Sequence, residues 1–302
     1  MPSGRAHVPV RQFPVNLSIV ARSEFSAENH GRTPSPGTLG TILQILIMTK
    51  RLLTIFIFLL TLGLTKAYAG WYECYNFTGT IDKYSITLSL QVRQGFFGEK
   101  DKKDFNIIGV YKYDKHNDPI RLEGKINFKD NKALLYEIHN NKHSATFEFN
   151  FSKNECSGVW RNLSTNKTMP LHLNFVSQLI DTLDKNQSTN IEILQANSLT
   201  GFYFIGEYSK IVGESRAQMD KLRIIRKKDN ITFQTIDFSK IETQTGNVMT
   251  IIFDNVEVIN AKTKELNVTN NIGRMGGFLT IYFDSKTQKF RLNPNPEIDG
   301  PN

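Results

Sequence analysis

Two histidines in the middle of the chain enclose a short polar run, and a turn there would bring them together. His139 and His143 flank the run NNK, and Glu137 lies two residues before His139. A tight hairpin would place the histidines opposite each other, with Glu137 on the same strand face as His139. Two imidazoles and a carboxylate can bind zinc, but solvated turns commonly have this composition. These three residues are weak candidates for a metal site, and we expect neither a metal nor a cofactor.

Acid–base catalysis would need carboxylates that lie close together with separated pKa values. Glu123, Glu137 and Glu148 each alternate with apolar residues, which indicates a solvent-facing position unless that face turns inward around a polar lumen. A nucleophile motif of the form G-x-S-x-G is absent from the sequence. We therefore assign no catalytic residue and expect a protein that is not an enzyme.

Both cysteines, Cys74 and Cys156, follow a segment that resembles an export signal. Two cysteines in an exported chain favour one disulfide, because the compartment is oxidising. The alternative is a pair of buried free thiols. The sequence predicts the Cys74–Cys156 disulfide.

The export signal itself lies inside the chain. Met48 to Arg51 is basic, Leu52–Leu64 is a 13-residue apolar run, and Ala67–Ala69 forms an A-x-A cleavage site. That run is shorter than the roughly 20 residues that span a bilayer, so we read residues 48–69 as a signal peptide and expect no stable membrane span after cleavage. Residues 1–47, with four arginines and no lysine, are interpreted as an upstream extension of the reading frame or a disordered leader. The location that follows is periplasmic or secreted.

Most of the net charge of +8 belongs to residues 1–69. Residues 1–69 hold seven Lys or Arg and two Asp or Glu, so the remainder carries 30 basic and 27 acidic residues, a net of +3. A mixed surface of this kind does not indicate nucleic-acid binding. The basic run at 221–228, KLRIIRKK, alternates as an edge strand would, where lysines block unwanted pairing. We expect no nucleic-acid partner.

The mature chain alternates apolar and polar residues with the period of a β-strand. About eight such stretches lie between residues 70 and 176, separated by short runs of turn-forming residues. An antiparallel meander of this kind removes its exposed edges most simply by closing into a barrel. We predict an all-β protein whose first domain, residues 70–176, is an up-and-down barrel of about eight strands, with a sandwich as the alternative.

Residues 177–200 break the alternation and are predicted to form a short helix and linker, because Leu179, Ile180 and Leu183 have helical spacing. Strand patterns resume in residues 201–293, which predicts a second small antiparallel β domain. The tail at 294–302, PNPEIDGPN, is predicted to be disordered.

Several stretches of the first domain together resemble small exported bacterial β-barrel domains of the lipocalin-like, or calycin-like, kind. They are FTGTIDKYSITLSL, IGVYKYDKHNDPIRLEGKI, ALLYEI, ATFEFNF, CSGVW and MPLHLNF. The resemblance covers residues 70–176 and implies a fold and a compartment. It carries over no site residue, and the G-x-W element of the first lipocalin strand is not matched at Gly70-Trp71.

The function that this pattern favours is binding without catalysis. The partner would be an unidentified protein, as for an inhibitor or immunity protein, or an apolar small ligand held by aromatic side chains. With a protein partner, an exposed binding edge would be formed by Trp71, Tyr72 and Tyr75. The alternatives are a hydrolase that acts on envelope material through Glu137 or Glu123, and a structural component of the envelope.

Overall fold

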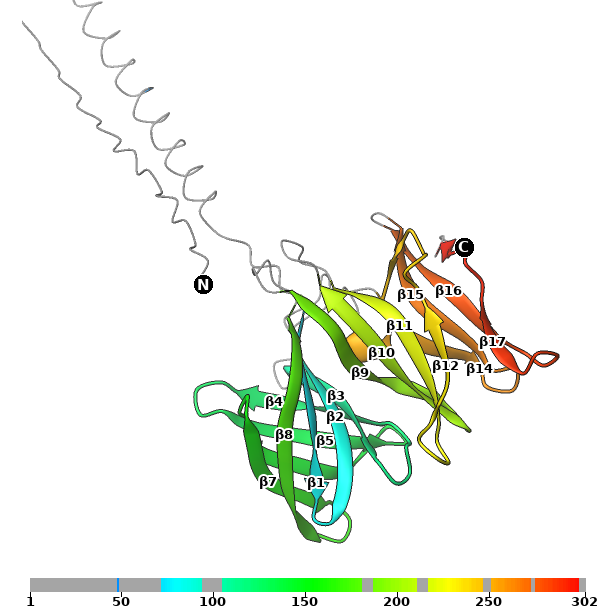
Figure 1. Ribbon diagram of the computed structural model, residues 1–302. Coiled ribbons are helices and arrows are strands. Elements are labelled where there is room, and N and C mark those ends of the chain that lie inside the picture. The colour runs from blue at the N-terminus through cyan, green and yellow to red at the C-terminus, as the bar shows by residue number, and fades with distance from the viewer. Residues whose placement is uncertain are drawn as a thin grey trace, which may run out of the picture. The chain divides into compact units, whose positions relative to one another are not determined.

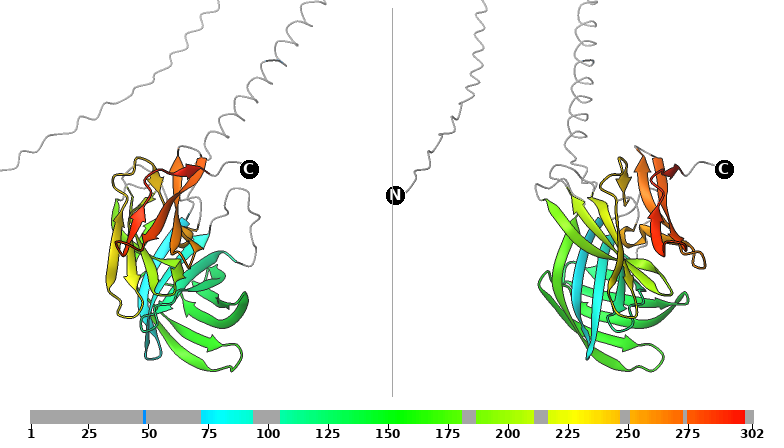
Figure 2. Two further views of the ribbon diagram at one scale, coloured as in Figure 1. Left: turned by 90° about the vertical axis from the view of Figure 1, so that its right-hand side faces the viewer. Right: turned by 45° about the vertical axis from the view of Figure 1, so that its right-hand side comes forward.

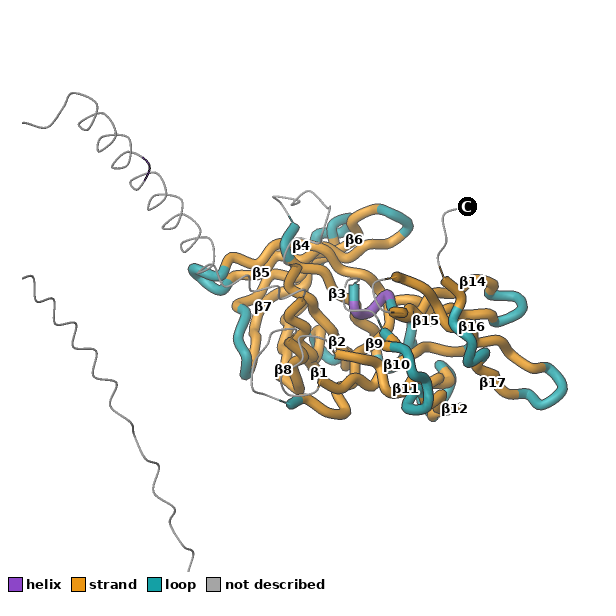
Figure 3. The backbone as a smooth tube through the Cα atoms, turned by 90° about the horizontal axis from the view of Figure 1, so that it is seen from above, coloured by secondary structure: helices purple, strands orange, loops and turns teal. Residues whose placement is uncertain are grey.

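The computed structural model describes Met48 and residues 72–93, 105–180, 187–210, 217–246, 251–272 and 275–298. The described residues from Tyr72 onward form an all-β structure with one 3₁₀ turn, η1 (Ile252–Asp254) (Figures 1 and 3). The signal peptide that we predict lies outside these ranges, apart from Met48. Among the described residues, no helical segment has the length and apolarity needed to cross a membrane.

The first eight strands form a closed antiparallel barrel in which each strand pairs with the next and β1 pairs with β8. The predicted barrel is therefore confirmed. Its strands are β1 (Tyr72–Ile81), β2 (Tyr84–Arg93), β3 (Ile107–Tyr113), β4 (Ile120–Asn127), β5 (Lys132–His139), β6 (Lys142–Asn150), β7 (Glu155–Asn162) and β8 (Thr168–Ile180).

Alternation along each barrel strand separates the interior from the outer wall. On β2, Ile86, Leu88 and Leu90 are completely buried and belong to the interior core. On β6, Phe147 and Phe149 face the same core, whereas Glu148 between them is exposed. The interior is filled by large side chains: Phe147 meets Tyr111 edge-on with ring centroids 5.1 Å apart.

The prediction of a helix and linker at 177–200 is wrong for the described part of that range, which forms β-strands. Ser177–Ile180 continue β8, where Leu179 pairs with Cys74 of β1, and Ser188–Leu199 form β9. Pairing with β1 requires β8 to continue to Ile180, and that long-range pairing overrides the helical spacing of the leucines. Residues 181–186, including Leu183, lie outside the described residues.

The second half consists of two sheets. A four-stranded sheet has the order β12-β11-β10-β9, and a six-stranded sheet contains β13-β15-β16-β17, with β14 on β15 and β18 on β16. The bounds are β9 (Ser188–Leu199), β10 (Phe202–Lys210), β11 (Ala217–Arg226), β12 (Thr232–Asp237), β13 (Gln244–Thr245), β14 (Val256–Asn260), β15 (Glu265–Ile272), β16 (Met275–Asp284), β17 (Lys289–Leu292) and β18 (Glu297–Ile298).

Figure 2 shows the two sheets as adjacent layers, and one apolar core includes residues of both, such as Phe204 of β10 and Ile281 of β16. Three buried residues of the outer barrel wall, Cys74, Val110 and Leu179, belong to this same core. The barrel and the two sheets lie within one compact unit, Ala67–Asn302. The outer wall of the barrel is therefore a packing surface for the second half.

Two other expectations for the second half need correction. The basic run KLRIIRKK lies mostly on β11, which is an interior strand of its sheet, between β10 and β12. Within it, Arg223 is paired across the strands, with Glu192 at 2.5 Å and Glu207 at 3.1 Å. In the tail at 294–302, Glu297–Ile298 pair with Gly277 and Phe278 of β16 beyond the end of β17, so this part is not disordered. Residues 299–302 lie outside the described residues.

Candidate functional site

The sequence predicts that Glu137 faces the solvent, but in the structure it faces the barrel interior. It pairs with Leu122 and Ala145, two buried interior residues. Its carboxylate accepts hydrogen bonds from the Tyr111 hydroxyl and from Ser144 Oγ, the latter at 2.7 Å. Burial, and then the charge of Glu137, raise the pKa of Tyr111 far above its ordinary value. Tyr111 therefore remains a hydrogen-bond donor to this carboxylate.

The candidate metal ligands are not brought together. Asn140 and Asn141 have positive φ angles of 49° and 59°, so the predicted tight hairpin does form. The ring of His143, however, stacks on Tyr136 at 4.5 Å, and its Nε2 lies 3.0 Å from Glu123 Oε1 on the outer wall. Because Glu137 points inward, it cannot share a metal with His143. Among the described residues no cluster of three metal-ligating side chains occurs.

Two of the three glutamates considered for catalysis, Glu123 and Glu148, lie on the outer wall of the barrel, and Glu137 lies inside it. Glu123 bonds to His143 outside the barrel, and Glu137 bonds to Tyr111 inside it. Glu148 is an outer-wall residue that pairs with Leu134 and Val159. Glu137 cannot share a reacting centre with either of the others, because it lies on the opposite face of the barrel wall.

The predicted disulfide is wrong, because Cys74 and Cys156 are buried free thiols. Cys74 belongs to the core outside the barrel and Cys156 to the core inside it. The strands that carry them, β1 and β7, both pair with β8. Cys74 lies opposite Leu179 of β8, and Cys156 lies opposite Leu173. Six residues along a strand correspond to about 20 Å. Closure therefore does bring the first and seventh strands to either side of β8, but at different heights and on opposite faces.

We expect both thiols to resist modification in the folded protein. Burial raises the pKa of Cys74 far above its ordinary value and also raises the pKa of Cys156, and the thiolate is the reactive form. A thiol reagent such as dithionitrobenzoate should react only after unfolding in guanidinium, and a reductant should leave the melting temperature unchanged. Unfolded protein without titratable thiols, or a lower melting temperature on reduction, would show that the bond forms after all.

A hollow of about 740 Å³ lies at one end of the barrel, where β1 begins, β2 ends and the β4–β5 and β6–β7 turns lie. Its apolar lining comes from Tyr75, Val92 and Phe151, which are buried, and from Phe128, which is 54% exposed. The Tyr75 and Phe151 rings meet edge-on with centroids 5.2 Å apart. Below them, the Phe77 ring meets the Phe151 ring edge-on, with centroids 6.2 Å apart, and forms the floor. The hollow is therefore a mouth above a packed interior.

Charged and polar groups surround this apolar floor. Glu73 accepts a hydrogen bond from the Tyr75 hydroxyl, and Lys153 Nζ lies 5.3 Å from the centre of the Tyr75 ring. Burial, together with this hydrogen bond, raises the pKa of Tyr75, so the hydroxyl remains a donor. Asn106 is held in place by two hydrogen bonds to the backbone of Ile126, at 2.8 and 2.9 Å. Among the described residues, the lining of the mouth thus combines apolar surface with the ammonium of Lys153 and the carboxylate of Glu73.

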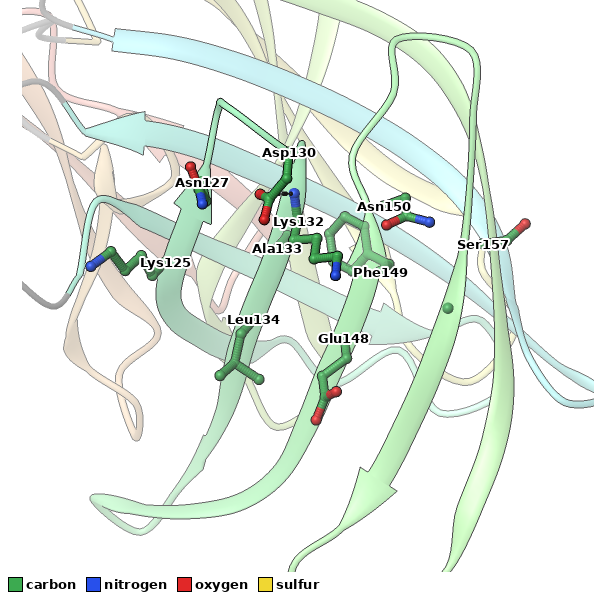
Figure 4. Close-up of a pocket in the computed structure, with 11 residues that line it drawn as sticks. Lys125, Asn127, Asp130, Lys132, Ala133, Leu134, Glu148, Phe149, Asn150 and Ser157 are labelled. Carbon is green, nitrogen blue, oxygen red and sulfur yellow. Dashed lines mark hydrogen bonds between the residues drawn. The ribbon is translucent and has the colours of Figure 1, made fainter.

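A second hollow, of about 580 Å³, lies on the outer wall over β4, β5, β6 and β7 (Figure 4). Figure 4 shows Lys125, Leu134 and Glu148, which are cross-strand neighbours on β4, β5 and β6. Asp130 Oδ1 accepts a hydrogen bond from the backbone N–H of Lys132 at 3.2 Å. Positive and negative side chains alternate over this surface, as on an ordinary solvated sheet face, and we assign it no function.

The aromatic edge expected from Trp71, Tyr72 and Tyr75 is not supported at Tyr75, which is 2% exposed. Trp71 and the Tyr72 side chain lie outside the described residues. Of the residues that line the mouth, Tyr75 was singled out from the sequence, although as part of an exposed edge, whereas Phe128 and Lys153 were not. The available signal was an aromatic residue, Phe128, in a turn, which breaks the expectation that turns are polar.

Comparison with known proteins gives no relative: no family model, no curated protein and no solved structure matches this chain.

Proposed function

We propose that this protein is a binding module without catalytic activity, and that it holds a small ligand with an apolar body and a polar end at the barrel mouth. The observation that carries this proposal is the hollow of about 740 Å³, with Tyr75, Val92 and Phe151 as its floor and Lys153 and Glu73 at its edge. Small-molecule sites commonly have volumes of about 300–1,000 Å³, with mostly apolar walls and a few polar groups that orient the ligand.

The packed interior limits where the ligand lies. Phe77, Ile86 and Phe147 are completely buried within the barrel, so a ligand would rest on the aromatic floor with one side toward the solvent. Lys153 would attract an anionic or hydrogen-bond-accepting end, and the exposed Phe128 ring would cover part of the apolar body.

Export to the periplasm or the exterior is part of this proposal, as is the likeness to lipocalin-like domains. The signal-peptide pattern at residues 48–69 supports export, and the closed barrel of eight antiparallel strands is consistent with the likeness. Of the alternatives, a hydrolase based on strand glutamates has less support, since Glu123 and Glu137 lie on opposite faces of the barrel wall.

Binding at the mouth can be tested with anilinonaphthalene sulfonate, a probe with an apolar body and an anionic end. We expect the folded wild-type protein to enhance its fluorescence and Phe128→Ser to weaken binding about fivefold, because about 1 kcal/mol of apolar contact is lost. The matched control is Ile231→Ser, since Ile231 has the same 54% exposure and does not line the hollow.

A second pair of variants tests the polar end. Lys153→Gln should weaken binding of the probe. Lys167→Gln, in the β7–β8 turn at the other end of the barrel, should leave its binding unchanged. Wild-type protein that leaves the probe unbound, or variants at Phe128 and Lys153 that bind like their controls, would contradict the proposal.

A further inference from the structure

A separate cavity of about 430 Å³ lies where the barrel meets the second half. The β3–β4 loop of the barrel contributes Lys115 and His116, the β9–β10 turn contributes Thr200 and Gly201, and the end of β11 contributes a third group of residues. This loop and the β4–β5 turn of the mouth lie at opposite ends of β4. The cavity is therefore independent of the proposed mouth site.

Basic side chains predominate in the lining of this cavity. Arg226, Lys227 and Lys228 line it together with Lys115, and among the described residues Asp118 is the one carboxylate of the lining. Asp118 bonds to Lys227, and Arg226 Nη2 lies 3.0 Å from Asp229. Among the described residues, neither Lys115 nor Lys228 has an ion-pair partner. The cavity therefore keeps a positive charge that its own carboxylates do not neutralise.

Hydrogen bonds fix the three segments relative to one another. Asn117, which is 2% exposed and has a φ of 59°, donates from Nδ2 to the Lys227 carbonyl at 3.0 Å. It also accepts a bond from Lys112 Nζ at 2.9 Å. The Lys227 N–H donates to the Gly201 carbonyl at 3.0 Å. The backbone segments that carry the cations are thus fixed relative to one another, which reduces the entropy lost when a ligand binds.

The cavity also has open space beside the turn that Gly201 belongs to. A Cβ built on Gly201 would meet no atom within 4 Å, so the turn leaves room beside its backbone. The Thr200 hydroxyl belongs to the same lining. Guanidinium, ammonium and hydroxyl donors around one space are the groups that bind phosphate oxygens.

We propose that this cavity binds the phosphate group of a small phosphate monoester. Lys115 and Lys228 supply the uncompensated charge, and the Arg226 side chain and Thr200 belong to the same lining. The volume exceeds that of the phosphate alone, so the group would belong to a larger molecule, either a soluble metabolite or a lipid headgroup.

Calorimetry on the full mature chain can test this with glycerol 3-phosphate as the soluble probe. Binding should be measurable at low salt and weaken as salt is added. The double variant Lys115→Gln/Lys228→Gln should bind at least about tenfold more weakly, because two charge-assisted contacts are removed. The control is Lys286→Gln/Lys289→Gln, which removes two exposed lysines around the β16–β17 turn.

Sedimentation with phosphatidylcholine vesicles that contain phosphatidic acid distinguishes the two sources. Binding of the soluble probe that is lost in the cavity variant and kept in the control supports the proposal with a soluble ligand. Vesicle binding alone, with the same variant dependence, supports it with a lipid headgroup as the source. If neither probe binds, or if both double variants bind alike, the proposal is wrong, whatever the outcome at the barrel mouth.

Discussion

Replacing Gly158 by alanine should unfold the barrel or cost at least about 4 kcal/mol of its stability. Gly158 lies on β7 opposite Phe149 of β6. A Cβ built there would lie 2.0 Å from the Glu148 carbonyl oxygen and 2.7 Å from the Phe149 Cα. These are backbone atoms of the neighbouring strand, so the clash cannot be relieved by a side-chain rotation. The β6–β7 ladder would have to separate. Urea unfolding followed by circular dichroism, together with soluble yield, measures the effect.

Two other glycines make the test quantitative. Gly276→Ala should change stability by no more than about 0.5 kcal/mol, because no atom lies within 4 Å of its added Cβ. Gly109→Ala should be intermediate: its closest neighbour, at 2.6 Å, is the flexible Leu90 Cδ2, although the Ser89 carbonyl oxygen lies at 3.0 Å. Equal stabilities for the three variants would show that the close strand approach at Gly158 is not required.

The barrel could be predicted because the information that specifies it is local. Alternation places Ile86, Leu88 and Phe147 on one face, and each short turn forces the next strand to run antiparallel. The end of β8 could not be predicted in this way. Leu179 has helical spacing in the sequence, and its extended conformation depends on pairing with Cys74, about a hundred residues earlier.

The candidate site was harder to predict from the sequence, because the direction of a side chain depends on the register in which the strands pair. Glu137 alternates with apolar neighbours as a solvent-facing residue would, yet it points inward because Leu122 and Ala145 flank it on the inner face. The disulfide failed for the same reason, since closure brought the strands of Cys74 and Cys156 near β8 but on opposite faces. Local pattern gives the elements, and pairing decides which side chains meet.

Alkaline pH should unfold the protein cooperatively, because four tyrosines of the described residues are buried as neutral hydroxyls. Each is at most 2% exposed, and burial raises the pKa of each above the ordinary value of about 10; they are Tyr75, Tyr111, Tyr203 and Tyr208. Unfolding exposes these hydroxyls, so above about pH 10 the unfolded chain releases protons that the folded protein retains. Stability is then complete below this pH and falls as the pH rises, by about 1.4 kcal/mol per pH unit for each group.

Tyr208→Phe provides the test of this mechanism. The Tyr208 hydroxyl donates to the Ile252 carbonyl at 3.1 Å and accepts from Asn255 Nδ2 at 2.9 Å, so its removal should lower stability near neutral pH. The same change removes one titrating group. The fall of the unfolding free energy from about pH 10 to 11 should therefore be shallower by about 1 kcal/mol, whereas Tyr84→Phe, at a 45% exposed position, should keep the wild-type slope. Urea titrations by circular dichroism at several pH values, with tyrosinate absorbance, give both quantities. A wild-type stability that stays constant up to about pH 11 would contradict the burial of protonated tyrosines.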